Sequence, residues 1–194
     1  MRIFNTIALF ACFLIIHPIY SQNKSENNKK TGYWEHKDAQ GRIYAEGEYL
    51  NDFRTGAWKF YISEHSRNKH QANVSGVYGS NGIKQGKWVY TNFHTETSVQ
   101  VNFTNDLMQG ECFYSDGNNS ILAKGLMVDG IRHGKWIFYD SNNSTGAYHS
   151  SGLKLNKIMS EGFYKDGMRI GTWAYDYFLD VNTHVKGSLS FTNG

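Results

Sequence analysis

The sequence is poor in cysteine, proline, net charge and long apolar runs. Its 194 residues include 2 cysteines and 1 proline. No run of eighteen apolar residues occurs, which excludes a conventional membrane-spanning helix. The formal net charge of +3 is too small for a dedicated nucleic-acid-binding protein, which usually carries a marked basic excess.

Aromatic residues and glycine are plentiful. Aromatic residues make up 15% of the chain, which argues against wholesale disorder. The 20 glycines do not follow the every-third-residue period of collagen. The length suits one ordinary domain or a short array of small repeated units.

The first residues have the layout of a secretory signal peptide. Residues 1–21 hold one basic residue, Arg2, then an apolar core over 7–16, then Pro18 and the small residue Ser21. This order of charge, apolar core and small residue predicts cleavage after Ser21 and export of the chain. Residues 22–30 (QNKSENNKK) are polar without periodicity and are expected to form a flexible leader.

Export would leave the chain with one cysteine. Cys12 lies inside the predicted signal peptide, so Cys112 would stand alone. A single cysteine cannot form an internal disulfide, and the exported domain must then be stabilised by packing and hydrogen bonds.

A repeated Gly-x-aromatic motif is the strongest signal in the chain. Its glycines recur at steps of 24, 30, 24, 24 and 37 residues, so three of the five steps are identical. All five tryptophans fall in the aromatic slot, and a degenerate copy has a cysteine there. The slot is occupied by Trp34, Trp58, Trp88, Cys112, Trp136 and Trp173.

Each full copy of this motif follows a second landmark and a turn. A glycine at the second residue of segments 46–49, 75–78, 124–127 and 161–164 precedes the motif glycine by 9 or 10 residues. The turn pairs between them are Asn51-Asp52, Asn81-Gly82, Asp129-Gly130 and Asp166-Gly167. Such pairs between alternating apolar residues predict β-hairpins, because tight turns need positive φ there.

Alternation along the second strand of each hairpin predicts a tryptophan ladder. Trp58 and Phe60 would share one face with Trp136 and Phe138, while Lys59 would point the other way. A single hairpin is marginal alone, so stacking of the copies is needed to bury the rings. The tryptophan ladder is interpreted as part of the packed core of the sheet. An exposed aromatic platform for glycans or single-stranded DNA is the alternative.

Residues 161–175 (EGFYKDGMRIGTWAY) resemble the MORN repeat, in its bacterial variant with Gly-Lys-Trp and an aromatic pair. Residues 125–139 (GLMVDGIRHGKWIFY) match equally well. The copy at 100–114 departs, with Val101 for glycine, Leu107 for the turn glycine and Cys112 for tryptophan. The resemblance implies a twisted antiparallel single-sheet solenoid with scaffolding, protein-binding or membrane-surface roles, and does not imply catalysis.

We therefore predict an all-β repeat domain over residues 31–194, a single antiparallel sheet of about five hairpins. Two links between hairpins are long, at 62–74 and 140–160, and both should leave the same edge of the sheet. Loops at one edge often form a binding face. The candidate partner contacts in them are His65, Arg67, His70, Tyr148, His149 and Lys154.

Half-units are expected at both ends of the array. The segment 32–34 is a second strand without a first, and 186–191 resembles a first strand without a second. Their unpaired edges could pair with each other between chains or with a partner's strand. A frayed or covered edge is the alternative.

No catalytic, metal or cofactor site is predicted. The eight histidines show no metal-ligand spacing with cysteine or carboxylate partners. Cys112 occupies a tryptophan slot and is expected to be a small buried residue, and the turn carboxylates serve backbone geometry.

The predicted function is that of an exported protein-binding or scaffolding module of the cell envelope. Its expected partner is an envelope protein, with a membrane surface as a second candidate and nucleic acid excluded. The first alternative is an antitoxin or immunity-type protein that binds a toxin, which the resemblance to the bacterial variant implies. The second is a hydrolase acting on envelope polymers.

Overall fold

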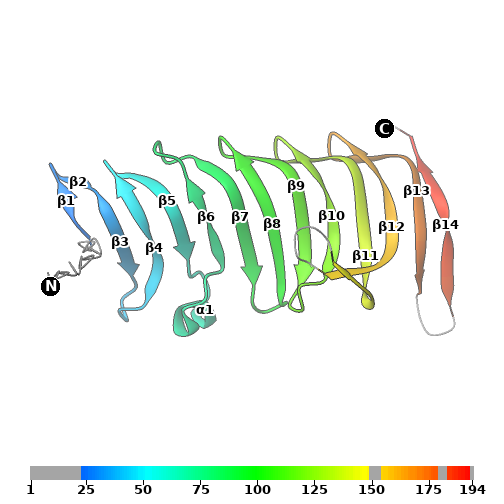
Figure 1. The fold of residues 1–194 in the computed structure, drawn as a ribbon, viewed down its shortest axis with the longest axis horizontal. Coiled ribbons are helices and arrows are strands. Elements are labelled where there is room, and N and C mark those ends of the chain that lie inside the picture. The colour runs from blue at the N-terminus through cyan, green and yellow to red at the C-terminus, as the bar shows by residue number, and fades with distance from the viewer. Residues whose placement is uncertain (1–22, 149–153, 179–182, 193–194) are drawn as a thin grey trace, which may run out of the picture.

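The predicted fold class is confirmed. The computed structural model describes residues 23–148, 154–178 and 183–192, and the predicted signal peptide lies outside them. Twelve strands of the described residues form one antiparallel sheet in strict chain order, from β3 at one end to β14 at the other (Figure 1). The sheet is open, since β3 and β14 lie at opposite ends.

The elements follow one another with short connections. A small separate hairpin, β1 (Ser25–Glu26) and β2 (Lys29–Lys30), comes first, and one helix, α1 (Glu64–Lys69), follows β5. The strands of the large sheet are β3 (Gly32–Lys37), β4 (Ile43–Leu50), β5 (Phe53–Phe60), β6 (Val74–Tyr78), β7 (Lys84–Asn92), β8 (Thr97–Thr104), β9 (Leu107–Asp116), β10 (Ile121–Val128), β11 (Ile131–Tyr148), β12 (Lys154–Lys165), β13 (Met168–Phe178) and β14 (His184–Phe191).

Two-residue turns close four of the five hairpins. In each turn both residues have positive φ, as at Asp129 (51°) and Gly130 (81°), which matches the twist of the flanking strands. The β8–β9 turn is Asn105–Asp106, so Asp106 replaces the turn glycine and the assignment to Leu107 was wrong by one residue. The β6–β7 link is longer, and Asn81-Gly82 lies inside it.

A bulge recurs at the motif glycine of each hairpin. In the β4–β5 pair, Gly47 faces Trp58 and the next pair joins Glu48 to Thr55, so two residues of β5 are bypassed. One of these is Gly56, whose φ of 63° glycine adopts more readily than residues with a side chain. All six motif glycines have φ between 61° and 77°.

The tryptophan slots all point to one face of the sheet, which we call the Trp face. Trp58, Trp88, Trp136 and Trp173 are at most 1% exposed, and Cys112 belongs to the same core cluster. Trp34, on the end strand β3, is half-buried against this cluster. The opposite face carries a smaller cluster around Phe113, Ile121 and Tyr139.

The landmark glycines leave room for the indole rings. A Cβ at Gly47, Gly76, Gly125 or Gly162 would lie 2.1–2.4 Å from a ring atom of the facing tryptophan. The indole therefore lies flat on the backbone of the neighbouring strand, and any side chain at these glycines would overlap it.

The two long links differ from the loops that were expected. Residues 62–74 contain α1, which begins after Ser63, whose Oγ accepts a hydrogen bond from the Ser66 N–H at 3.1 Å. Residues 140–160 are mostly strand, because β11 and β12 continue past the sheet and pair at Ser144–Asn156 and Tyr148–Lys154. The polar composition that indicated a loop does not prevent pairing, since the ladder uses backbone groups.

The two ends of the sheet are also unlike each other. Residues 23–30, expected to be a structureless leader, form β1–β2, and the Asn23 N–H donates to the Tyr33 carbonyl at 2.9 Å. The Glu35 N–H donates to the Asn23 Oδ1 at 3.0 Å, so the leader covers part of the β3 edge. Among the described residues β14 pairs with β13 alone.

Candidate functional site

A basic residue covers each indole on the Trp face. It lies two residues before the motif glycine in every copy that has a tryptophan, and Met108 takes its place before Cys112. Sequence reasoning missed these residues, although their fixed spacing from the glycine was a sufficient signal. We call Lys30, Arg54, Lys84, Arg132 and Arg169 the cation row.

The contact between each cation and its ring is close. The Arg54 Cζ lies 4.8 Å from the Trp58 ring centroid, and the Lys84 Nζ lies 4.5 Å from that of Trp88. The other three distances, for Lys30, Arg132 and Arg169, are 5.0, 4.7 and 4.5 Å. Each is within the range of a cation–π interaction, so the repeat is built as glycine, indole and cation in three layers.

Two tyrosines and an arginine complete a typical unit. The Tyr49 ring meets the Trp58 ring edge-on at 5.0 Å, and Tyr78 meets Trp58 at 6.3 Å. The Arg54 Nη1 donates to the Tyr78 hydroxyl at 3.4 Å. The guanidinium is thus held by its own repeat and by the next one along the sheet.

Four members of the cation row, all except Lys30, have hydroxyl partners, and within the described part of the chain no member has a carboxylate partner. The Lys84 Nζ donates to the Tyr90 hydroxyl at 3.2 Å, and the Arg169 Nη1 donates to the Tyr175 hydroxyl at 3.2 Å. On the opposite face two lysines are paired with glutamates, with 3.6 Å between Lys59 Nζ and Glu46 Oε1 and 2.9 Å between Lys135 Nζ and Glu161 Oε2. The Trp face therefore carries an uncompensated line of positive charge.

A second row of rings accompanies the cations. One half-buried aromatic side chain occurs two residues after each tryptophan slot, and we call these the aromatic row. They are His36, Phe60, Tyr90, Tyr114, Phe138 and Tyr175. Burial first, then Lys30 and Arg54, lower the pKa of His36, so this ring is uncharged at neutral pH.

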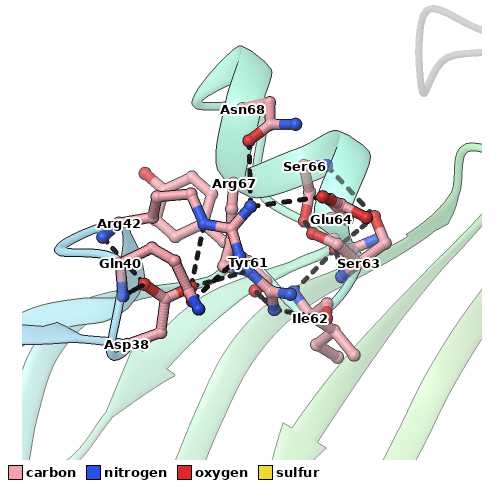
Figure 2. A network of polar contacts seen from close by, with 11 residues as sticks. Asp38, Gln40, Arg42, Tyr61, Ile62, Ser63, Glu64, Ser66, Arg67 and Asn68 are labelled. Atoms are coloured by element: carbon pink, nitrogen blue, oxygen red, sulfur yellow. Dashed lines mark hydrogen bonds and ion pairs between the residues drawn. The ribbon is translucent and has the colours of Figure 1, made fainter.

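A hollow of about 660 Å³ lies on the Trp face beside α1. Arg54, Lys84 and Phe60 from the two rows line it, together with Arg42 and Arg67. Its wall at α1 is a network of polar contacts (Figure 2). We call Asp38, Arg42, Ile62 and α1 the α1 corner.

The network holds α1 firmly against the sheet. The Arg42 Nε contacts Asp38 Oδ2 at 3.0 Å, and its Nη1 reaches Glu64 Oε1 at 3.4 Å (Figure 2). The Arg67 Nε lies 3.3 Å from the same Asp38 oxygen, and its Nη1 donates to the Ile62 carbonyl at 2.9 Å. The helix is therefore a fixed part of the surface.

The structure brings together three of the six predicted partner contacts. His65 and His70 are exposed on and after α1, with the His70 ring 4.9 Å from that of Tyr61. Arg67 is half-buried in the network, so it supports α1 instead of offering a free side chain. Arg67 also lines the hollow, and its contact with a partner stays a prediction.

The other three candidates lie elsewhere. Tyr148 and Lys154 are paired at the far end of the β11–β12 hairpin, six strands along the sheet from β5, and His149 is outside the described residues. Because β5 and β11 run in the same direction, both insertions lie along one edge of the sheet (Figure 1). They do not form one site.

The described residues contain no group of three or more metal-ligating side chains, and none of their helices is long and apolar enough to cross a bilayer. Burial raises the pKa of the Cys112 thiol to about 11, which makes it a poor nucleophile at neutral pH.

Comparison with known proteins adds no assignment. No family model matches this chain, and a search of curated proteins finds no match.

Proposed function

We propose that this chain is an exported, non-catalytic protein-binding or scaffolding module of the cell envelope. The signal-peptide layout of residues 1–21 and the resemblance of the repeats to the MORN variant both support this proposal. A sheet locked by stacked indoles is a rigid platform, and rigid surfaces lose little conformational freedom on binding.

The observation that carries the proposal is the α1 corner. Its helix is fixed by the Arg42 and Arg67 contacts, yet Ile62 beside it is 66% exposed and Tyr44 is 44% exposed. Apolar side chains held in the open beside a hollow suit a partner's anchor side chain. A partner protein would dock there, with His65 and His70 at the border.

Site-specific photo-crosslinking in the native host tests this proposal. A crosslinking residue at Ile62 should give a discrete adduct with one envelope protein, and one at Lys87, exposed on the opposite face, should not. The same adducts at both positions, or at neither, would contradict it. Recovery of the chain from the cytosol with residues 1–21 intact would contradict the export step.

A further inference from the structure

The cation row is spaced like the charges of a regular polymer. Its members stand on alternate strands, β5, β7, β11 and β13, with β9 left out, and Lys30 stands just before β3. Two strand spacings amount to about 9.5 Å. The cations therefore form one line along the sheet, interrupted at Met108 on β9.

The row is open to a ligand. Lys30, Arg54, Lys84 and Arg132 are half-buried and Arg169 is exposed, while the indoles below them are covered. Hydroxyl groups leave the positive charge of each cation uncompensated. A carboxylate brought to the Trp face would thus meet charged donors already held in place.

The aromatic row gives the same face an apolar component at the same interval. The half-buried rings of Phe60, Tyr90, Phe138 and Tyr175 can pack against the apolar faces of sugar rings. The buried indoles cannot, which rules out the tryptophans themselves as the stacking platform.

We propose that the Trp face binds an acidic polysaccharide with one carboxylate per disaccharide, laid across the strands. An extended disaccharide is close in length to two strand spacings, so successive carboxylates would meet successive cations. This proposal goes beyond the protein partner proposed above and uses different residues from the exposed ones of the α1 corner.

Nucleic acid fits the row less well. Phosphates in a duplex recur about every 3.4 Å along each strand, much more densely than the cations. The net charge of +3 is also small for such a ligand.

Met108 interrupts the cation row. It suggests methionine as the neutral replacement for a cation, and it is the position at which a cation can be added. Arg54→Met and Arg132→Met remove the charge and keep an unbranched apolar side chain over the indole, like the one that Met108 places beside Cys112. Met108→Lys would fill the gap between Lys84 and Arg132. Lys87→Met removes a charge from the opposite face and is the matched control.

The test is calorimetric titration of the purified chain with hyaluronan oligosaccharides of defined length. We expect Arg54→Met and Arg132→Met each to weaken decasaccharide binding about fivefold, and Lys87→Met to leave it unchanged. Met108→Lys should tighten decasaccharide binding and leave the weak binding of a disaccharide unaltered. Thermal unfolding of each variant shows whether a loss of binding reflects a loss of fold.

Several results would overturn the proposal. These are no binding by the folded wild type, equal losses in Lys87→Met and Arg132→Met, and no gain in Met108→Lys. Tighter binding of polyglutamate or oligo-dT with the same dependence on the row would assign the face to an acidic protein segment or to single-stranded nucleic acid instead. None of these results depends on the crosslinks at Ile62, so the two proposals fail separately.

Discussion

Val101 lies directly across from Cys112, at the one position where the array has neither the landmark glycine nor the indole. The two residues are paired in the β8–β9 register and are 2% and 1% exposed. Met108 stands where the other copies have a cation, and it packs against the same core cluster. Val101, Cys112 and Met108 together thus fill the volume that one indole fills in the other copies. The degenerate copy is therefore a complete, packed hairpin with different core side chains.

This pairing predicts a strong coupling between the two positions. Cys112→Trp should lower the free energy of unfolding by about 1–3 kcal/mol, because the ring would overlap the Val101 side chain. Val101→Gly alone should also cost about 1–3 kcal/mol through the cavity it leaves. The double variant should recover most of both losses in urea denaturation. Additive losses would show that the two side chains do not share one space.

The landmark glycines should tolerate no side chain. Gly125→Ala would place a Cβ 2.2 Å from the Trp136 ring, so we expect a loss of about 1–3 kcal/mol in the free energy of unfolding. Gly187→Ala is the control, since a Cβ there meets nothing within 4 Å. Equal effects of the two substitutions would contradict the flat stacking of indole on backbone.

The carboxylate of Glu46 should make the free energy of unfolding depend on pH in the acidic range. Burial opposes its charge, but hydrogen bonds from the Tyr33 and Tyr61 hydroxyls, each at 2.6 Å, and the charge of Lys59 outweigh burial and hold the pKa of Glu46 below its ordinary value. Because the pKa of Glu46 is lower in the folded than in the unfolded chain, its carboxylate stabilises the fold at pH values above the unfolded pKa. This stabilisation is lost as the pH falls through the folded pKa.

Glu46→Gln measures this contribution. The variant should be less stable than the wild type by about 1–2 kcal/mol at pH 7, and the difference should shrink as the pH falls below about 4.5. Glu111→Gln, which removes an exposed carboxyl of the same face, serves as the control in the same pH series. A difference that stays constant with pH would refute the role given to the carboxylate charge.

Cys112 should be unreactive in the folded protein. Burial raises its pKa to about 11, and only 1% of the residue is exposed. We expect iodoacetamide at pH 8 to leave the native chain unmodified for hours and to alkylate it rapidly in urea. Fast modification of the native chain would indicate an open or activated thiol.

Much of the fold could be predicted from local chemistry that repeats. Turn pairs such as Asp129-Gly130 need positive φ, and the alternation of Trp136 and Phe138 assigns a face, so hairpins and their stacking follow from sequence. The landmark glycines mark the repeat in the sequence, but the reason for them, an indole that lies on the facing strand, requires the bulged register within each hairpin.

The candidate site was predicted less well, because its contacts join residues that lie far apart along a strand or along the chain. Alternation places Arg54 and Trp58 on one face but four residues apart, and only the bulge at Gly56 shortens that separation to a contact. The polar composition of 62–74 predicts a loop, although the Ser63 cap and the distant Asp38 together stabilise a helix there. Long-range ion pairs of this kind leave no local pattern.

The central claim is that four indoles, those of Trp58, Trp88, Trp136 and Trp173, each lie between a glycine of the neighbouring strand and a cation of the same repeat. Proton NMR tests it most directly, because hydrogens under an aromatic face resonate far upfield. The Hα signals of Gly47, Gly76, Gly125 and Gly162 should be shifted strongly upfield, and that of Gly187 should be ordinary. In Trp136→Leu the Gly125 signal alone should return to its usual position. Ordinary shifts for all four glycines in the wild type would contradict the account.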